Sequence, residues 1–569
     1  MRLTKLHIQN FRGIKNLTIE PDRDVTVLIG ENNSGKTSIL EALRIGLEQI
    51  KSVKTCNFSE YDFYRDNKKN HISLCDKITL TYSFEESKEH QWSSEIFQAL
   101  NEIIVGEEYA KINLQISAWY ESPDKDLKQE WNFLDNNGNI MSGKQNLLKE
   151  LHKIRPFFYL YVIRDVKQEF HGKTTFWSSF LRNKDINETT RIKLENELET
   201  INRKIVEAHT SFKDVEKEIK RLSCIIAAGK TDPVTIEPVP ANVFNTLQHT
   251  QINVLTENNV KIPLKNHGGG TQSLSVLLLF SAYLKSQLDK ETHKLADPII
   301  ALEEPEAHLH PNAVRSLWNV LKSLPGQKII ATHSGDILSE VPLNNLRRVK
   351  KEIEGTKLYH LPESALTEEE LRKFEHHVRR NRGELLFANC WLLVEGETEV
   401  SVISSATDIL GENLSQYGIR LVEYCQAGGP DIFIKTADAL SIQWHAVLDS
   451  DLTGKRNLRK AENLLDSREQ DDHITLLPYQ NMDVLLCCAG YGKPYIDGVP
   501  EDRKHKITAP KDSIDYCSQV YSIVNKLDRF SKPAAAMEAV FMMRKKGKDG
   551  VPPGIHDIIK KAIRLTEVK

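Results

Sequence analysis

The chain has few of the features that would place it in a membrane or outside the cell. Its 569 residues contain no apolar run of the roughly 18 residues that a membrane-spanning helix needs. The N-terminal sequence, MRLTKLHIQNFRG, alternates like a strand and lacks the apolar stretch of a secretory signal. Only eight cysteines occur and none forms a Cys-x-x-Cys pair, which argues against a disulfide framework or a cysteine zinc site. We therefore expect a cytoplasmic protein with reduced thiols and no membrane contact.

Strong net charge is also missing. The 76 lysines and arginines and the 79 aspartates and glutamates leave a net charge of −3, which excludes a general polyanion binder. A nucleic-acid surface would have to be a local basic patch, with acidic sites elsewhere in the chain. The 40% hydrophobic content is typical of globular proteins, and at about 150 residues per domain the length predicts three to four domains.

Glycine and proline are absent from residues 183–225, which are highly charged. Apolar residues recur there at alternating steps of four and three: Leu194, Leu198, Ile201, Ile205, Ala208, Phe212, Val215, Ile219 and Leu222. A repeat of 3.5 residues predicts a coiled coil or a paired helical hairpin, and its function would be a dimerisation arm. The alternative is a long surface helix packed on its own domain. A second charged stretch, residues 366–383, is predicted to be a linker.

A phosphate-binding motif follows a predicted buried strand at residues 25–29, and a helix is expected from about Ser38. Residues 30–37 read Gly-Glu-Asn-Asn-Ser-Gly-Lys-Thr and fit the pattern G-x-x-x-x-G-K-[ST]. The glycines let backbone N–H groups close around phosphates, and the helix N-terminus favours an anion. Lys36 would pair with the β and γ phosphates of ATP, and Thr37 would hold Mg²⁺. The candidate nucleotide-binding residues are Gly30, Asn33, Gly35, Lys36, Thr37 and Ser38.

Two carboxylates end a hydrophobic strand much later in the chain, at residues 298–305. Glu303 occupies the position of a water-bridged or outer ligand of Mg²⁺, and Glu304 that of a carboxylate which polarises the attacking water. Alone, paired acids at a strand end are usually a solvated turn. Together with the phosphate-binding motif they indicate a nucleotide-hydrolysing site.

Two further motifs could likewise be either functional or purely structural. Residues 267–273 read His-Gly-Gly-Gly-Thr-Gln-Ser and open an apolar helix, so they form either a second anion cradle or a flexible turn. Its candidate nucleotide contacts are Gly269, Gly270, Gln272 and Ser273. His333 ends another predicted strand, where an isolated histidine is more often structural than functional.

Taken in order, these motifs resemble the ABC-type ATPases of the structural-maintenance and RecF-like group. The opening Asn10-Phe11-Arg12-Gly13 is similar as well. The resemblance implies two ATPase heads that face each other, each glycine-rich signature loop contacting the nucleotide of the other head. This chain departs from the transporter signature Leu-Ser-Gly-Gly-Gln, so the hydrolysis rate and the role of the nucleotide stay open.

The C-terminal third contains a set of acidic strand ends. Glu395 ends a predicted strand at residues 391–394, and Glu399 follows in the first helical turn. Asp449 and Asp451 end a second strand, and Asp483 is a further carboxylate. Hard oxygen ligands suit Mg²⁺ or Mn²⁺, which would relieve the mutual repulsion of these groups. One or two ions could activate a water and steady the leaving oxygen of a phosphodiester. The alternative treats each acid as an exposed strand-end residue.

This acidic pattern resembles the Toprim domain of topoisomerases, primases and the overcoming-lysogenization-defect (OLD) nucleases. The Gly428-Gly429 turn and the segment Ile163-Arg164-Asp165 are similar to the OLD family, as is the order of the parts. The implied fold is α/β, with an ABC-type ATPase head, a helical coiled-coil insertion and a C-terminal Rossmann-like Toprim domain. The parts would be residues 1–182 and 229–375 for the head, 183–228 for the dimerisation insertion and 388–569 for the Toprim domain.

The resemblance also implies a catalytic lysine, for which Ser531-Lys532-Pro533 is the matching segment; a solvated helix-start lysine is the equal alternative for Lys532. A basic tail lies beyond it and suits a phosphate backbone, unless it is a plain charged surface. The basic tail consists of Arg544, Lys545, Lys546, Lys548, Lys560, Lys561 and Arg564.

The main hypothesis is a nucleotide-regulated, metal-dependent DNA endonuclease that uses ATP and Mg²⁺ or Mn²⁺ at both sites. Glu395, Asp449 and Lys532 would catalyse cleavage, and Glu304 would catalyse nucleotide hydrolysis. The resemblance implies anti-phage defence of the Gabija or retron type, a homodimer or larger homo-oligomer, and a helicase or a reverse transcriptase with its small DNA as alternative partners. A DNA-clamping ATPase and an RNA-cleaving enzyme are the competing hypotheses. A topoisomerase or a primase would need a tyrosine domain or a zinc module that the sequence lacks.

Overall fold

The computed structural model describes twelve stretches of the chain. They are residues 1–48, 56–65, 75–88, 91–106, 108–121, 126–161, 187–208, 238–240, 253–255, 261–288, 295–511 and 513–567. These residues divide into two compact units, one formed by residues 1–160, 295–306 and 314–569, the other by residues 161–294 and 307–313. Among the described residues, no helix is both long and apolar enough to cross a membrane.

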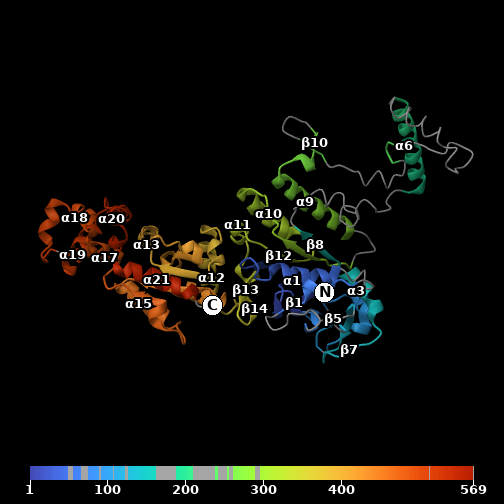
Figure 1. The fold of residues 1–569 in the computed structure, drawn as a ribbon, viewed down its shortest axis with the longest axis horizontal. Coiled ribbons are helices and arrows are strands. Elements are labelled where there is room, and N and C mark those ends of the chain that lie inside the picture. Colours follow the sequence, from blue (N-terminus) through green and yellow to red (C-terminus); the bar gives the residue numbers. More distant parts are fainter. Residues whose placement is uncertain are drawn as a thin grey trace, which may run out of the picture. The chain divides into compact units, whose positions relative to one another are not determined.

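An antiparallel sheet forms the first layer of the larger unit (Figure 1). Its strand order is β2-β1-β4-β5-β6-β7, from the strands β1 (Arg2–Phe11), β2 (Ile14–Ile19), β4 (Ile78–Glu85), β5 (Lys111–Tyr120), β6 (Leu127–Leu134) and β7 (Ile140–Met141). Alternate residues of β4 and β5 are buried, as expected for strands with one face against a core. The apolar side chains of β1, β4 and β5 pack in one cluster with helix α1 (Lys36–Leu43) and α3 (Leu148–Ile154).

The second sheet places the phosphate-binding loop. Its strand order is β14-β13-β3-β12-β11-β8, from β3 (Val25–Ile29), β8 (Phe157–Tyr161), β11 (Ile299–Glu303), β12 (Gln327–Ala331), β13 (Leu346–Glu352) and β14 (Gly355–Tyr359). β3 pairs in parallel with β12 and with β13, and all five of its residues are buried. A central parallel strand is covered on both faces, which explains its continuous run of β-branched residues. The loops after β3, β11 and β12 therefore leave the same edge of the sheet.

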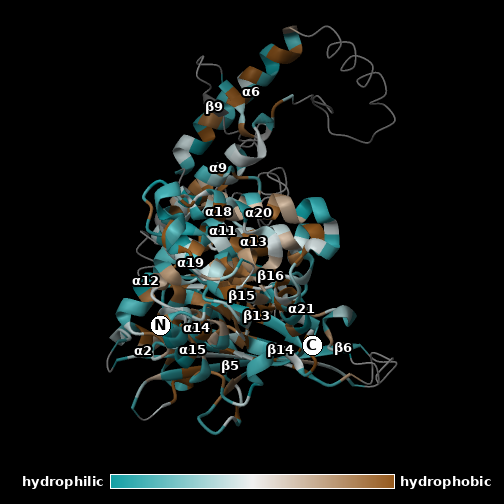
Figure 2. Ribbon diagram, turned by 90° about the vertical axis from the view of Figure 1, so that its left-hand side faces the viewer, coloured by the Kyte–Doolittle hydropathy of each residue, from teal (hydrophilic) through white to brown (hydrophobic). Residues whose placement is uncertain are grey.

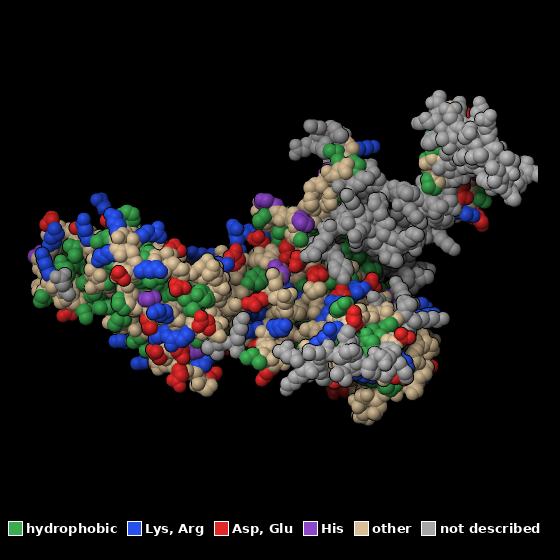
Figure 3. Space-filling model, viewed as in Figure 1, with side chains coloured by type: hydrophobic (Ala, Val, Ile, Leu, Met, Phe, Trp, Pro, Cys, Tyr) green, Lys and Arg blue, Asp and Glu red, His purple; other side chains and the backbone are tan. Residues whose placement is uncertain are grey.

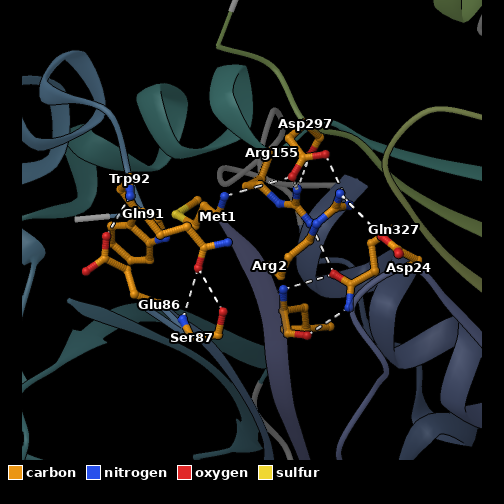
Figure 4. A network of polar contacts seen from close by, with 11 residues as sticks. Met1, Arg2, Asp24, Glu86, Ser87, Gln91, Trp92, Arg155, Asp297 and Gln327 are labelled. Carbon is orange, nitrogen blue, oxygen red and sulfur yellow. Dashed lines mark hydrogen bonds and ion pairs between the residues drawn. The ribbon is translucent and has the colours of Figure 1, made fainter. Parts of the chain in front are cut away.

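A buried polar network ties the two sheets together (Figure 4). The Gln327 side chain on β12 accepts a hydrogen bond from the Leu3 N–H at 2.9 Å and donates to the Leu3 carbonyl at 2.9 Å. Beside it, the buried Arg155 guanidinium forms an ion pair with Asp297 at 2.6 Å. Because an unpaired buried polar group is costly, these contacts fix how β1 lies on the second sheet.

The C-terminal sheet is separate and wholly parallel, in the order β16-β15-β17-β18. Its strands are β15 (Cys390–Val394), β16 (Ile419–Glu423), β17 (Gln443–Leu448) and β18 (Ile474–Leu476). Every residue of β15 is buried, and the ribbon around β15 has the brown colour of hydrophobic residues in Figure 2. Four long helices accompany the sheet: α13 (Glu397–Leu410), α14 (Pro430–Ala439), α15 (Leu452–Glu462) and α21 (Pro553–Glu567).

A helical group completes this part of the chain. It contains α17 (Met482–Leu486), α18 (Lys493–Asp497), α19 (Ile514–Val524) and α20 (Lys532–Lys546), which gather together in Figure 1. Their apolar side chains share one core with α13 and β15. The helical group is therefore packed on the C-terminal sheet.

The predicted linker at residues 366–383 is wrong, because the structure has helix α12 (Glu368–Arg380) there. Thr367 and Glu370 form a reciprocal capping box at its start. Phe374, His377 and Val378 lie on one helical face and are buried. The many charged residues of the segment belong to the other faces of an amphipathic helix.

The smaller unit contains α6 (Glu188–Ala208), α9 (Gly269–Leu288) and the two-stranded pair β9 (Asn253–Leu255) and β10 (Lys261–Pro263). The helical insertion predicted at residues 183–228 overlaps α6, and the later half of its apolar repeat lies outside the described residues. Leu194 and Ile201 of that repeat are exposed in the single chain, at 37% and 47%. An exposed apolar seam is what a dimerisation arm would present, so the arm stays a prediction.

Candidate functional site

The phosphate-binding loop has a backbone that only glycine allows at its first position. Gly30 has a φ of +150°, and a Cβ there would lie 2.2 Å from the Val349 carbonyl oxygen on β13. Gly35 has a φ of +114° and precedes the first residue of α1. The loop borders a cavity of about 720 Å³. The cavity is lined by Gly13, Asn32, Asn33, Ser34, Gly35, Lys36, Thr37, Ser38, Glu303, Glu304, Ala331, His333, Lys351 and Thr356.

Two buried groups in this loop suit an anion. Lys36 is 7% exposed, and its ammonium donates to the Gly30 and Glu31 carbonyl oxygens, each at 2.8 Å. Burial lowers its pKa to about 8, against the opposing influence of Glu304, Glu303 and Glu31. The Ser34 hydroxyl is buried with no hydrogen-bond partner among the described residues. A phosphate would supply both with oxygen acceptors, so these residues fit a nucleotide.

Thr37, in the first turn of α1, and Glu303, the last residue of β11, come together beside the phosphate-binding loop. The Thr37 hydroxyl donates to Glu303 at 2.6 Å, although the two residues are far apart in the chain. The Tyr159 hydroxyl on β8 donates to the other Glu303 oxygen at 2.9 Å. A hydroxyl and a carboxylate beside a phosphate loop are the usual oxygen ligands of a nucleotide-bound Mg²⁺. Tyr159 could not be selected from the sequence, because only the neighbouring places of β8 and β11 in the sheet bring it here.

His333 lies on the same cavity, where burial and the nearby Lys36 lower its pKa. Its backbone N–H donates to Glu306 at 3.0 Å, and the Thr332 hydroxyl donates to the same carboxylate oxygen at 2.7 Å. Burial raises the pKa of Glu306. Glu306 was not singled out in the sequence, although it stands three residues after Glu303. It holds the backbone that carries His333.

The glycine-rich signature lies in the smaller unit. There Gly269 opens α9, and a Cβ on Gly270 would come within 2.9 Å of the His308 carbonyl oxygen. The Ser273 hydroxyl donates to the Ala307 carbonyl at 3.3 Å, and the Gln272 side-chain amide donates to the His267 carbonyl at 2.6 Å. The contact of these residues with a nucleotide therefore stays a prediction.

The acidic residues of the C-terminal part collect at the carboxyl edge of the C-terminal sheet. Glu395 directly follows β15, and Asp449 directly follows the neighbouring parallel strand β17. Glu399 lies in the first turn of α13, where its carboxylate accepts a hydrogen bond from the Gly396 N–H at 2.9 Å. Asp451 is the N-cap of α15 and accepts from the Gly454 N–H at 2.7 Å. Ligands bind at this edge in open α/β sheets.

The electrostatics of this edge are those of crowded carboxylates. Asp449 is 8% exposed, and its burial raises its pKa to about 9, with further contributions from Glu399, Glu395, Asp451 and Asp483. Burial also raises the pKa of Glu399 to about 7. Like charges in a dry site raise one another's pKa, so these acids lie near one another.

The donor set fits a divalent cation in its chemistry. One Glu395 carboxylate oxygen is buried without any hydrogen-bond partner among the described residues. Among those same residues, no three acidic, histidine or cysteine side chains already converge closely enough to hold a metal ion. Carboxylates that repel one another would close around a cation only when it neutralises them. The predicted ligands are thus gathered on one edge, and their coordination of a metal stays a prediction.

Asp483 and Lys532 reach this region from the helical group. The buried Asp483 carboxylate on α17 accepts a hydrogen bond from the Tyr495 hydroxyl at 2.7 Å. Burial raises the pKa of Asp483, while Tyr495 and Lys532 oppose that rise. Lys532, the first residue of α20, donates to the Tyr521 hydroxyl at 3.1 Å and lies over its ring. The two tyrosines, which sequence reasoning missed, hold the predicted ligand and the predicted catalytic lysine.

Tyr424 is a further neighbour that the sequence gave no reason to select. Its N–H donates to the Val394 carbonyl at 3.0 Å, so it stands beside the strand end that carries Glu395. The side chain is 1% exposed, and its hydroxyl forms no hydrogen bond of ordinary geometry among the described residues. The Asn457 side chain on α15 is close enough to lower its pKa, which burial and the nearby Glu395 raise.

The basic tail is largely engaged within its own domain. Lys561 is buried and pairs with Asp471 at 2.7 Å, and Lys545 and Lys546 lie over the rings of Phe541 and Tyr491. Lys and Arg side chains do stand out over α18 and α20 in Figure 3. The tail is therefore a mixed surface, and its contact with a phosphate backbone stays a prediction.

Two family models match the chain. Residues 1–384 match the family described as "Protein of unknown function (DUF2813)". Residues 386–451 match the model described as "Overcoming lysogenization defect protein-like, TOPRIM domain". The second match spans β15 to β17 and includes Glu395, Glu399, Asp449 and Asp451.

Several curated proteins are similar over long segments. The uncharacterized protein YbjD of Escherichia coli is 31% identical over 288 residues, which are 50% of this chain and 50% of that protein. The OLD nuclease of Thermus scotoductus is 24% identical over 79% of this chain and 82% of its own. The endonuclease GajA of Bacillus cereus is 22% identical over 89% of this chain and 82% of its own. The match to YbjD thus covers only half the length of that relative.

Proposed function

Because the chain belongs to the family described as protein of unknown function (DUF2813) and carries an OLD-like Toprim domain, we propose that it is a nucleotide-regulated DNA endonuclease. An ATPase head fused to a Toprim domain in an α/β chain is the architecture expected from the sequence, and this family resemblance and fold class are confirmed. In this proposal, cleavage depends on a divalent metal held by the C-terminal acidic residues. Its biological role would be anti-phage defence.

The observation that carries the proposal is the crowding of buried carboxylates at the carboxyl edge of the C-terminal sheet. Asp449 has a pKa of about 9 because it is buried beside other acids. A fold that only needed a stable sheet end would not bury repelling groups there. Such a set is stable and useful when a divalent cation shares it, and two relatives that are similar over most of this chain are named nucleases.

Glu395, Glu399, Asp449, Asp451 and Asp483 would hold one or two Mg²⁺ or Mn²⁺ ions, which when bound would activate a water and steady the leaving oxygen. Lys532 would donate hydrogen bonds to a non-bridging phosphate oxygen, with Tyr521 fixing its direction. Tyr495 would keep the Asp483 carboxylate turned toward the site.

The head would bind ATP with Mg²⁺ in the cavity behind the phosphate-binding loop. Lys36 would transfer its hydrogen bonds from the loop carbonyls to the phosphates, and Thr37 and Glu303 would lie on the ion. Glu304 would orient the attacking water, and His333 would contact the γ-phosphate. Two heads would face each other in a homodimer or larger assembly, with the exposed apolar seam of α6 as a second contact.

Two alternatives remain distinct from this proposal. A DNA-clamping ATPase would bind DNA in a nucleotide-dependent way without cutting, and the full set of carboxylates counts against it. An RNA-cleaving enzyme would use the same acidic edge. Metal-dependent cleavage of a phosphodiester needs no 2′-hydroxyl, and none of the proposed site residues is assigned to recognise one. A helicase, or a reverse transcriptase with its small DNA, is a further partner to test.

The first experiment is plasmid cleavage by the purified chain. Supercoiled DNA is incubated with Mg²⁺ or Mn²⁺, with and without ATP, and nicked and linear forms are quantified. We expect metal-dependent cutting that Asp449→Asn lowers by at least about 100-fold, because a neutral amide is a poor ligand and cannot balance the cation. The matched control is Asp515→Asn, a change at an exposed position on α19.

Several results would decide against the proposal. An Asp449→Asn protein that cuts at the unchanged rate would remove the assignment of the metal site. Nucleotide-dependent DNA binding without cutting, under every metal tested, would favour the clamp. Faster cutting of a matched RNA would favour the RNA-cleaving alternative. The ATP comparison gives the direction of control, which the sequence left open.

A further inference from the structure

The helix that begins at the acidic edge carries a row of basic side chains. Helix α15 starts at Leu452, immediately after the N-cap Asp451. Lys455, Arg456 and Arg459 are exposed on this helix. Steps of three and four residues connect all of these positions, so they share one helical face with Leu452. We call Lys455, Arg456 and Arg459 the basic stripe.

The other face of the helix anchors it to the site. Gly454, Asn457 and Ala461 are buried, and a Cβ on Gly454 would lie 1.9 Å from the Asp449 carbonyl oxygen. A Cβ on Gly429 would come within 3.5 Å of the Asn457 side-chain oxygen. Close packing on both sides means that the direction of α15 is fixed relative to Asp449 and Asp451.

The charges of the basic stripe are available to a partner. No ion pair or side-chain hydrogen bond joins Lys455, Arg456 or Arg459 to another described residue. Their acidic neighbours are already occupied: Lys460 binds Asp431 at 3.0 Å, and Gln470 donates to Glu462 at 3.0 Å. Leu452 beside them is 80% exposed. In a chain with a net charge of −3, three free cations in a row next to an acidic edge indicate a specific anionic partner.

The basic tail is the other candidate surface for binding an anionic partner. It differs from the basic stripe because several of its charges have internal partners. Arg544 pairs with Asp408 at 3.8 Å, Arg564 pairs with Asp472 at 3.9 Å, and Lys561 is buried against Asp471. Side chains held by internal partners release fewer counterions when a polyanion binds. The basic stripe is therefore the better candidate for direct phosphate contacts.

We propose that the basic stripe of α15 binds the phosphate backbone of duplex DNA beside the scissile bond. The proposal rests on the proposed nuclease function of the acidic edge, whose substrate surface it identifies. From Lys455 to Arg459 the helix rises by ~6 Å, which is close to the ~7 Å that three successive phosphates span along one DNA strand. The exposed Leu452 would lie against the sugars between the metal edge and the cations.

The test is the salt dependence of DNA binding by the full chain. A labelled 30-base-pair duplex, a length of our choosing of about three helical turns, is titrated at several KCl concentrations with Ca²⁺ in place of Mg²⁺. The triple variant Lys455→Gln, Arg456→Gln, Arg459→Gln should bind about 10- to 100-fold more weakly near 0.1 M salt. The slope of its log affinity plotted against log salt concentration should be smaller in magnitude by about two to three, because three phosphate contacts are lost.

Two matched variants control for charge and folding. A tail variant, Arg544→Gln, Lys545→Gln, Arg564→Gln, changes the net charge equally at side chains that have internal partners and should keep the wild-type slope. A charge-preserving variant, Lys455→Arg, Arg456→Lys, Arg459→Lys, should bind within about 2-fold of wild type, because phosphate contacts read charge rather than sequence. A stripe variant that binds like wild type, or a tail variant that loses as much affinity, would overturn the proposal.

A small substrate separates this inference from the nuclease proposal. Bis(p-nitrophenyl) phosphate with Mn²⁺ needs the acidic edge but is too short to reach the basic stripe. The stripe variant should hydrolyse it at the wild-type rate while cutting plasmid more slowly. Equal loss on both substrates would overturn the stripe, and failure of the wild type on both would overturn the nuclease proposal itself. Tighter binding of duplex RNA than of DNA would overturn the choice of partner.

Discussion

Tyr424 is an unusual residue at the acidic edge. Its hydroxyl is buried beside Glu395 without a hydrogen-bond partner of ordinary geometry among the described residues. A buried hydroxyl in that state costs about 1–3 kcal/mol. A substrate oxygen or a bound water at the site would satisfy it.

We predict that Tyr424→Phe slows DNA cleavage by about 10-fold, because one hydrogen bond worth about 1.4 kcal/mol is lost from the occupied site. Single-turnover cleavage rates measure this, and the metal concentration for half-maximal rate should change by less than about 2-fold if Tyr424 is no ligand. The control is Tyr417→Phe, whose hydroxyl contacts Glu412 at 3.5 Å. A more stable Tyr424→Phe protein with an unchanged cleavage rate would contradict the prediction.

At the scale of elements, β17 positions Asp449 through a buried histidine. The His445 ring donates from Nδ1 to the Asp472 carbonyl at 2.7 Å and accepts from the Thr475 hydroxyl at Nε2, at 2.9 Å. Burial lowers its pKa to about 4. A neutral ring satisfies both partners, whereas a protonated ring would face the hydroxyl with a second donor.

This histidine predicts a pH dependence of stability. Because the folded pKa lies below the unfolded value of about 6.5, the stabilisation is complete above pH ~6.5 and is lost as the pH falls toward ~4, by up to about 3 kcal/mol. Urea midpoints measured between these limits should fall more steeply for wild type than for His445→Gln. His505→Gln, at an exposed position, should behave like wild type. Parallel curves for wild type and His445→Gln would contradict the assignment.

Elements with strong local signals were predictable, and amphipathic ones hidden by charge were not. The strand-loop-helix around Gly30 to Lys36 was predictable because glycine positions and an apolar run occur within a few residues. Helix α12 was missed because only Phe374, His377 and Val378 face its core, among ten other mostly charged positions. Its capping box at Thr367 and Glu370 was the available signal.

Over the whole molecule, the contacts that the sequence could not reveal are those between residues far apart in the chain. Tyr159 reaches Glu303 across 144 positions because β8 and β11 are neighbours in one sheet. Tyr424 reaches Glu395 because β16 pairs with β15. Motifs identify which strand ends carry acids, but strand order decides which other side chains meet them.

The same long-range contacts link the two sites of the larger unit. The Asn389 side-chain amide donates to Glu31 of the phosphate-binding loop at 2.7 Å. The buried Arg348 on β13 donates to the Ala388 carbonyl at 2.7 Å and to the Leu440 carbonyl at 3.1 Å. Residues 388 and 389 lead into β15, and residue 440 leads toward β17. The loop that would hold phosphates therefore contacts the start of β15, and the neighbouring strand β13 contacts the chain before both β15 and β17, the strands that end in the predicted catalytic carboxylates.

This connection predicts a variant in which nucleotide binding and cleavage are uncoupled. Asn389→Ala removes the contact with Glu31. The ratio of the cleavage rates with and without ATP should then move toward one by a factor of at least about 3. This factor corresponds to a change in coupling free energy near 0.7 kcal/mol. Nucleotide affinity and nucleotide-free cleavage should stay within about 2-fold of wild type, because Asn389 belongs to neither site. Asn413→Ala, at an exposed asparagine, is the matched control.

Lys36→Ala distinguishes lost coupling from lost binding, since it should weaken nucleotide binding itself by removing the cation of the phosphate-binding loop. Both variants would then lack the ATP effect, but only Lys36→Ala would fail to bind a fluorescent nucleotide. If Asn389→Ala keeps the full ATP effect, the signal does not pass through the Glu31 contact. Two residues of β13 would then remain as described connections to the starts of β15 and β17. They are the buried Arg348 and Lys350, whose ammonium donates to the Ser441 carbonyl at 2.9 Å.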